Sequence, residues 1–138
     1  MTQQQALDIL KTGANVFLTG EPGSGKTYTV NQYVGWLREQ GVSCAVTAST
    51  GIAATHINGR TIHSWSGIGV RTTLTSSDIT KIGSNARTAK RVREGSVLVF
   101  DEVSMLSSDT LAMVELVCRK VRKKDEPFGG LQVVLVGD

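Results

Sequence analysis

A glycine-rich segment near the N-terminus has the residue types and spacing of a phosphate-binding loop. Residues 20–27 read GEPGSGKT and fit the pattern Gly-x-x-x-x-Gly-Lys-[Ser/Thr]. Glycines let backbone N–H groups curl around an anion, and a helix that follows points the positive end of its dipole at phosphate. We expect Lys26 to reach the β- and γ-phosphates of a nucleoside triphosphate and the Thr27 hydroxyl to bind Mg²⁺. The other loop residues expected at the nucleotide are Gly20, Pro22, Gly23, Ser24 and Gly25.

Two carboxylates follow an apolar run later in the chain. Residues 97–100 predict a strand buried on both faces, and Asp101 and Glu102 come directly after it. Ligands of open α/β sheets bind at the carboxyl ends of the strands. We therefore expect Asp101 to hold Mg²⁺ through water, and Glu102 to orient or deprotonate an attacking water. A solvated turn is the alternative for such a pair, but the loop upstream disfavours it. A motor that hydrolyses ATP needs such a base for water, whereas a small-molecule kinase often lacks it, so Glu102 favours the motor ATPase.

A third group of small and hydroxylated residues occupies residues 47–54 and 59–65. At the end of a strand and the start of a helix, such residues offer hydroxyls and backbone amides to the phosphates of a nucleic acid. The pattern is weak by itself. His63 fits a turn cap or the core equally well, and Trp65 is more often a core residue than a platform for base stacking.

The strands and helices that must position these residues follow from apolar periodicity. We expect helices at residues 3–12 and 51–58, and strands at 15–19, 43–48, 97–100 and 132–136. Two further helices are indicated by apolar residues at helical spacing, one by Val30, Tyr33, Val34 and Leu37 up to Gly41, and a long one by Leu111, Val114, Val117, Cys118 and Val121. Thr2 and Gln5 fit a capping box for the first helix. Residues 67–85 have weak periodicity and predict a loop with room for one short helix. Alternating strands and helices predict an α/β fold with a mainly parallel sheet and helices on both faces. A strand before the loop and a helix after it favour nucleotide binding over a mere glycine-rich turn.

The composition is that of one soluble globular domain, because 40% of the 138 residues are apolar and 20% are charged. No apolar run approaches the roughly 18 residues that a membrane-spanning helix needs, and the polar N-terminus excludes a signal peptide. A cytosolic protein is the default expectation. Cys44 and Cys118 lie far apart in apolar stretches, which predicts reduced core residues rather than a metal site or a redox pair.

The positive charge is clustered in two stretches. The first stretch is Lys81, Arg87, Lys90, Arg91 and Arg93, and the second is Arg119, Lys120, Arg122, Lys123 and Lys124. Such clusters suit the phosphate backbone of a nucleic acid, because each neutralised phosphate releases counterions. Solvated helix faces are the more ordinary explanation. Charge by itself does not decide between the two.

With these pieces in order, the chain resembles the Pif-one (petite integration frequency) family of DNA helicases, in the RecD-like B-type branch of superfamily one. The motifs that carry the resemblance are residues 20–27, 47–54 with 61–64, 100–106, and 130–138. The resemblance implies a P-loop NTPase fold of the RecA-like type, a three-layer sandwich. It also implies 5′ to 3′ translocation on single-stranded DNA, fuelled by ATP with Mg²⁺, in DNA repair, recombination or telomere maintenance.

The resemblance also implies roles for individual residues. The residues that it places on the DNA-facing side are Thr47, Thr50, Gly51, His63 and Ser64. A glutamine near the N-terminus reads adenine in this family; by its distance from the loop we assign Gln3, with Gln4 and Gln5 as alternatives. The family places its fourth strand between the loop strand and the strand that ends in Asp101, which brings Asp138 close to the γ-phosphate.

The expected domain organisation is a single, incomplete unit. Residues 1–138 correspond to the N-terminal part of a first RecA-like motor domain, with the sheet unfinished at the C-terminus and a second RecA-like domain expected downstream. The expected partners are single-stranded DNA and duplex junctions, without a membrane. The protein would be cytoplasmic in a bacterium, and nuclear or mitochondrial in a eukaryote. Two alternatives stay open, a binding module without turnover and another P-loop ATPase such as a helicase loader.

Overall fold

The computed structural model describes residues 1–21, 23–56 and 58–137. Its α-helices are α1 (Gln3–Lys11), α2 (Lys26–Glu39), α3 (Gly51–His56), α4 (Ile62–Ser66), α5 (Ser76–Ser84), α6 (Ala86–Glu94) and α7 (Ser108–Arg122). Its strands are β1 (Val16–Thr19), β2 (Cys44–Ala48), β3 (Arg60–Thr61), β4 (Val97–Asp101) and β5 (Gln132–Gly137). Two 3₁₀ helices are η1 (Val103–Met105) and η2 (Pro127–Gly130).

The strands form one sheet in the order β1-β5-β4-β2-β3, and every neighbouring pair is parallel. β5 therefore lies between β1 and β4, as the family resemblance implied. In register, Thr19 lies opposite Gly137, and Ala48 lies opposite Asp101. Because the strands are parallel, their carboxyl ends meet at one edge of the sheet, where ligands of such sheets bind.

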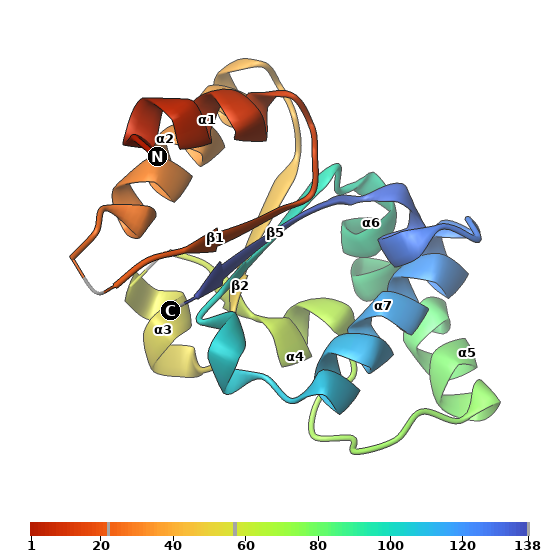
Figure 1. Ribbon diagram of the computed structural model, residues 1–138. Coiled ribbons are helices and arrows are strands. Elements are labelled where there is room, and N and C mark those ends of the chain that lie inside the picture. The colour runs from red at the N-terminus through yellow and green to blue at the C-terminus, as the bar shows by residue number, and fades with distance from the viewer. Residues whose placement is uncertain (22, 57, 138) are drawn as a thin grey trace.

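Helices cover both faces of the sheet, so the molecule has three layers (Figure 1). The strand β4 shows how the sequence builds them, since its successive side chains point to opposite faces. Val97 and Val99 pack in a core with α1 and α2, whereas Leu98 and Phe100 pack in a core with α4 to α7. The predicted α/β class with a parallel sheet between two helical layers is confirmed.

The first helix, α1, begins with the predicted capping box. The Gln5 backbone N–H donates to the Thr2 hydroxyl over 3.1 Å, and the Thr2 N–H donates to the Gln5 side chain over 2.8 Å. The buried face of α1 presents Leu7 and Leu10 to α2 and the sheet. The cap fixes where the helix starts, and therefore which glutamines of its first turn point toward the neighbouring loop.

A glutamine on β5 ties both helices of this layer to the sheet. Gln132 accepts a hydrogen bond from the Tyr33 hydroxyl of α2 over 2.6 Å. Its side-chain amide donates to the carbonyls of Leu10 and Ala14, at 3.1 Å and 2.9 Å. Burial raises the pKa of Tyr33 above its ordinary value, although the hydrogen bond to Gln132 acts in the opposite direction. These contacts fix α1 and α2 relative to β5, the neighbour of the strand that leads into the glycine-rich loop.

Sequence periodicity missed three elements. β3 and α4 occupy residues 60–66, and α6 covers residues 86–94. The uncertain stretch 67–85 contains one short helix, α5, as predicted, after a loop at residues 67–75. The eight elements predicted from periodicity are all present, and the ends that were predicted differ from the observed ones by at most two residues. Residue 57 of the predicted helix 51–58 lies outside the described residues.

Both cysteines are free thiols. The prediction of a core residue is confirmed for Cys118, whereas Cys44 packs at the margin of the core. Cys118 is buried and Cys44 half-buried. Burial raises the pKa of Cys44 to about 11 and that of Cys118 to about 12, because a thiolate would lose its hydration there. Among the described helices, none combines the length and the hydropathy that a membrane crossing requires.

Candidate active site

The glycine-rich loop connects β1 to α2 at the carboxyl edge of the sheet. Gly25 is the N-cap of α2 in the left-handed region, with φ +90°, where a side chain would be strained. Its carbonyl accepts the Thr29 backbone N–H at 3.0 Å and the Thr29 hydroxyl at 3.1 Å. The first turn of α2 is thereby held against the loop, so that the N-terminal end of the helix lies at the loop, as anion binding requires. Pro22, predicted at the nucleotide, lies outside the described residues.

The Lys26 side chain crosses from the loop to the neighbouring strand. Its ammonium donates to the Gly20 carbonyl, and to the Gly137 carbonyl at the end of β5 over 3.2 Å. The parallel pairing of β1 with β5 makes this contact possible, since both strands end at the same level. Asp138, predicted near the γ-phosphate, follows Gly137 directly and lies outside the described residues.

The two acids follow β4 at the same edge of the sheet. The half-buried Asp101 accepts the Glu102 backbone N–H over 2.9 Å, which fixes the carboxylate at the end of the strand. Glu102 is exposed and has left-handed backbone angles, φ 52° and ψ 45°. Few residues other than glycine adopt this conformation, and it is enriched where a side chain must be aimed at a functional site. The chain then turns into η1, which packs against Gly137.

One cavity of about 650 Å³ joins the loop to the acids. The predicted residues that line it are Gly23, Gly25, Lys26, Thr27, Asp101 and Glu102. Tyr28 and Met105 also line it with largely exposed side chains, 57% and 68%, and periodicity gave no signal for either. The structure thus brings together residues far apart in the sequence, as predicted for a nucleotide site.

The oxygen ligands at this cavity fit a magnesium ion. Thr27, which carries a hydroxyl, and Asp101, which carries a carboxylate, both line it. Among the described residues, no cluster of three or more His, Cys, Asp or Glu side chains could hold a metal by itself. This agrees with the way Mg²⁺ binds beside nucleotides, where one or two protein oxygens combine with phosphate oxygens and water.

Of the three consecutive glutamines, Gln3 contacts the loop. Its side chain lies over Gly25, where a Cβ atom would come within 1.9 Å of Gln3 Nε2. A smaller cavity of about 160 Å³ is lined by Gln3 together with Ser24, Gly25 and Lys26. The Gln4 side chain instead bonds Asp8 at 2.8 Å, and Gln5 forms the cap of α1. Position therefore favours Gln3 over its two neighbours as the residue beside a nucleotide.

The residues predicted to face DNA divide into two groups. Thr50 and Gly51 are exposed at the start of α3, where the Thr50 hydroxyl accepts the Ala53 N–H over 3.2 Å. On α4, Ser64 is exposed and His63 half-buried.

Thr47 does not fit the predicted DNA-facing role. Its side chain is fully buried, and its hydroxyl donates to the Val99 carbonyl of β4 over 2.6 Å. The small polar residue supports the pairing of two central strands instead, so we leave it out of the DNA surface. Trp65 is 4% exposed, which confirms the core interpretation for this residue.

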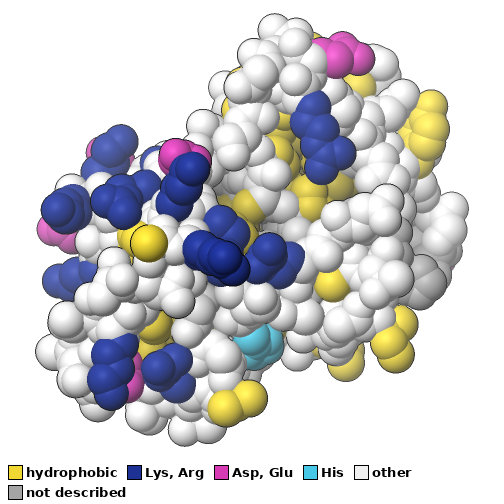
Figure 2. Space-filling model, turned by 180° about the vertical axis from the view of Figure 1, so that it is seen from behind, with side chains coloured by type: hydrophobic (Ala, Val, Ile, Leu, Met, Phe, Trp, Pro, Cys, Tyr) yellow, Lys and Arg dark blue, Asp and Glu magenta, His cyan; other side chains and the backbone are white. Residues whose placement is uncertain are grey.

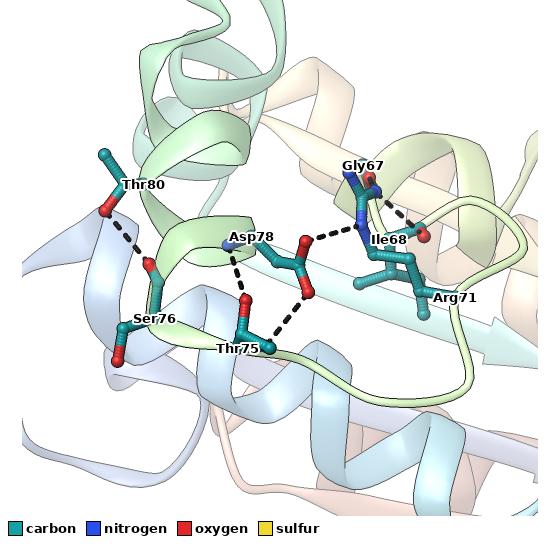
Figure 3. A network of polar contacts seen from close by, with 7 residues as sticks. All are labelled: Gly67, Ile68, Arg71, Thr75, Ser76, Asp78 and Thr80. Carbon is teal, nitrogen blue, oxygen red and sulfur yellow. Dashed lines mark hydrogen bonds and ion pairs between the residues drawn. The ribbon is translucent and has the colours of Figure 1, made fainter.

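The helix α4 is held in place by an arginine in the loop that follows it (Figure 3). Arg71 donates to the Gly67 and Ile68 carbonyls at 3.0 Å and 3.1 Å, and its Nε lies 3.5 Å from Asp78. Asp78 also accepts the Thr75 backbone N–H in the capping box of α5. This hydrogen bond above all, and Arg71 in addition, keep the pKa of Asp78 below its ordinary value. The loop is thereby closed at its base.

Several residues of the two basic stretches have structural partners. Arg119 pairs with Glu115 at 2.6 Å and with Asp125 at 3.0 Å. Arg122 donates to four backbone carbonyls, and Arg91 donates to the Ser64 carbonyl at 3.1 Å. These three arginines hold helices and loops together. A sequence pattern cannot distinguish them from arginines that face solvent.

The sequence matches the PIF1-like helicase family over residues 2–138. The chain belongs to this family. It is 55% identical over its full length to the ATP-dependent DNA helicase Pif1 of Psychrobacter sp., of which it covers 21%. Its structure is similar to the crystal structure of the Candida albicans Pif1 helicase, with a TM-score of 0.93 and 36% identity over 99% of this chain and 31% of that one.

A second solved PIF1-like structure contains ligands. It is a Bacteroides Pif1 helicase in complex with ADP-AlF3 and single-stranded DNA, with a TM-score of 0.85 and 34% identity over 99% of this chain and 31% of that one. The fold described above is therefore the RecA-like P-loop fold of PIF1-like helicases. The chain spans about a fifth of the length of the Psychrobacter relative and about a third of these two solved chains.

Proposed function

We propose that this chain is the nucleotide-binding part of the first motor domain of an ATP-dependent DNA helicase. The observation that carries the proposal is the shared cavity, which Lys26 and Thr27 line together with Asp101 and Glu102. Family membership supports it, as does the similarity to helicases solved with nucleotide analogues and DNA. The term whole protein is used for a chain that contains these residues and has the length of the relatives.

The residues predicted from the sequence would divide nucleotide binding and hydrolysis among them. The loop N–H groups and Lys26 would hold the phosphates, while Thr27 and Asp101 would hold Mg²⁺, which supplies charge neutralisation when bound. Glu102, exposed at the cavity, would orient a water molecule and accept its proton. Gln3 would contact the adenine, since it lies against the loop. Asp138 remains a candidate beside the γ-phosphate on sequence grounds.

The DNA partner would lie along α3 and α4. Thr50, Gly51 and Ser64 expose small polar groups there, with His63 beside them. Such groups suit phosphate and sugar contacts, which position a strand without reading its sequence. In the whole protein, hydrolysis would move single-stranded DNA 5′ to 3′ toward a duplex junction, with a second RecA-like domain closing on the cavity.

The second candidate function is that of a module that binds ATP and hydrolyses it slowly, and the lining of the cavity favours it for the isolated chain. Among the described residues that line it there is no arginine. An arginine that stabilises the transferring phosphoryl group contributes on the order of 10³- to 10⁵-fold in rate. We therefore expect the 138-residue chain to bind ATP and to hydrolyse it slowly. Rapid hydrolysis by the isolated chain would contradict this expectation.

The proposed direction of movement is tested by strand separation. Two duplexes that differ only in the polarity of a single-stranded tail are incubated with the whole protein, ATP and Mg²⁺. We expect separation of the 5′-tailed duplex and not of the 3′-tailed one. Separation of the 3′-tailed duplex instead would refute the direction, and separation of neither would refute the helicase activity.

A further inference from the structure

A groove lined by arginines runs along the outer side of β2 and shares no lining residue with the nucleotide cavity. Its volume is about 440 Å³. Arg38 at the end of α2, Arg60 of β3 and Arg91 of α6 line it, above a floor formed by residues 43–46. Figure 2 shows Lys and Arg side chains gathered near the middle of this face of the molecule.

The groove exists because β3 is short. β3 pairs with β2 only at Thr47 and Ala48, so the first three residues of β2 have no neighbouring strand on that side among the described residues. Those residues, Cys44, Ala45 and Val46, are only half-buried, because β2 forms the edge of the sheet along this stretch. A ligand can therefore reach a part of the sheet that a longer strand would have covered.

The positive charge of the groove is poorly compensated. Within the part of the chain that the structure describes, Arg38 and Arg60 form no ion pair with a carboxylate, and Glu94 is the acidic residue of the lining. Arg91 donates to neutral backbone carbonyls, and its Nε is buried without a hydrogen-bond partner. Burial first, and the charge of Arg60 second, lower the pKa of Arg91. A bound anion would relieve this repulsion.

The groove adjoins the helix that we assign to the DNA surface. Arg60 precedes the N-cap of α4 directly in the chain, and Arg91 donates to the Ser64 carbonyl at 3.1 Å. A DNA strand that contacts His63 and Ser64 would therefore lie next to Arg60 and Arg91, which line the groove. An acidic protein segment that pairs with the open edge of β2 would satisfy the same charges, but it would leave this continuity with α4 unexplained.

We propose that the groove binds the phosphate backbone of DNA and so extends the DNA surface beyond α3 and α4. The proposal rests on the proposed helicase function and adds Arg38, Arg60 and Arg91 to it. Arg91 has two tasks, since it also holds α4. Arg38 and Arg60 are the residues to test, because within the described residues neither side chain forms a hydrogen bond that holds the fold together.

The test measures DNA affinity against salt concentration for the whole protein. The double variant Arg38→Gln/Arg60→Gln is compared with wild type on a single-stranded oligonucleotide and on a tailed duplex, by fluorescence anisotropy. The logarithm of the association constant falls linearly with the logarithm of the salt concentration. Two lost phosphate contacts should make this slope less steep by roughly 1 to 2, with the larger change for duplex DNA and the smaller for a single strand. Lys120→Gln, an exposed cation on α7, is the matched control and should keep the wild-type slope.

Each other outcome overturns the proposal in a recognisable way. If wild type binds no DNA, the helicase function fails together with the groove. If wild type binds DNA and the double variant keeps its slope, only the groove is wrong. An equal fall in Lys120→Gln would assign the effect to net charge. Binding of a polyglutamate peptide that the double variant loses, with DNA binding unchanged, would assign the groove to an acidic protein segment.

Thermal unfolding of each variant shows whether it is folded. If the double variant is not, Arg38→Gln is used by itself, because Arg38 is exposed near the end of α2 and lies outside the sheet. Its expected loss of slope is roughly 0.7 to 0.9. Arg38→Lys keeps the charge and should restore the wild-type slope.

Discussion

The chemistry proposed for this chain depends on a few side chains that backbone groups hold in place. Lys26 is bound to the carbonyls of Gly20 and Gly137, and a bound phosphate would compete with these carbonyls for its ammonium. Glu102 takes left-handed backbone angles at the end of β4, next to the carboxylate that accepts its N–H. The loop and the strand ends therefore set the positions of these reactive groups.

The position of Gln3 makes a prediction about nucleotide selectivity. Gln3→Ala should weaken ATP binding about tenfold, equivalent to ~1.4 kcal/mol of lost hydrogen bonding, and should affect GTP less. Competition with a fluorescent nucleotide measures both. Gln4→Ala is the matched control, since Gln4 bonds Asp8 on the same helix and lies off the loop. Equal losses for the two variants would refute the assignment of adenine recognition to Gln3.

The buried thiols predict how stability depends on alkaline pH. Their folded pKa values, about 11 for Cys44 and about 12 for Cys118, lie above the value of about 8.5 for an unfolded cysteine. The folded protein therefore favours the protonated thiols. This contribution to the free energy of unfolding is fully present below the unfolded pKa, and it is lost as the pH rises through the folded values. Urea unfolding between pH 7 and 11 should show this fall, and Cys44→Ala/Cys118→Ala should reduce it. An identical pH dependence in the variant would contradict the prediction.

Among the elements, those with a full apolar period could be predicted, and short or strongly polar ones could not. β4 is an unbroken apolar run, and α7 buries five residues of one face. β3 has two residues, too few for any period, and α6 carries mostly basic and small side chains around a thin buried face of Thr88, Ala89 and Val92. Its helix depends on packing against α7, which the sequence of the segment itself does not reveal.

That packing depends on Arg122 of α7. Its guanidinium donates to the carbonyls of Val92, Arg93 and Gly95 at the end of α6, at 3.0, 2.9 and 2.7 Å, and to the Gly129 carbonyl at 2.8 Å. Arg122→Ala should lower the free energy of unfolding by about 2 kcal/mol or more, because charge-assisted hydrogen bonds are lost and carbonyls are left without donors. Denaturant unfolding measures the change. Lys120→Ala, on the same helix, should change it by less than about 0.5 kcal/mol.

For the whole molecule, the decisive feature is the strand order. Insertion of β5 between β1 and β4 brings Gly137 to Lys26, and the parallel register brings Asp101 to the same edge. Spacing in the sequence predicted the loop and the acids, but their common cavity follows from a topology that only the family resemblance implied. The buried position of Thr47 could not be predicted, because a small polar side chain at the end of a strand is equally compatible with the surface and with a hydrogen bond inside the sheet.

The central claim, that this cavity hydrolyses ATP to drive a DNA motor, is tested most directly by DNA-stimulated ATP hydrolysis. The rate is measured in the whole protein with and without single-stranded DNA, for wild type, Lys26→Ala and Glu102→Gln. We predict that DNA raises the wild-type rate and that Lys26→Ala loses both ATP binding and hydrolysis. Glu102→Gln should keep ATP affinity within a few-fold while its rate falls roughly 10²-fold or more, since it loses the base for water. Hydrolysis by Glu102→Gln at the wild-type rate, or a wild-type rate that DNA leaves unchanged, would contradict the claim.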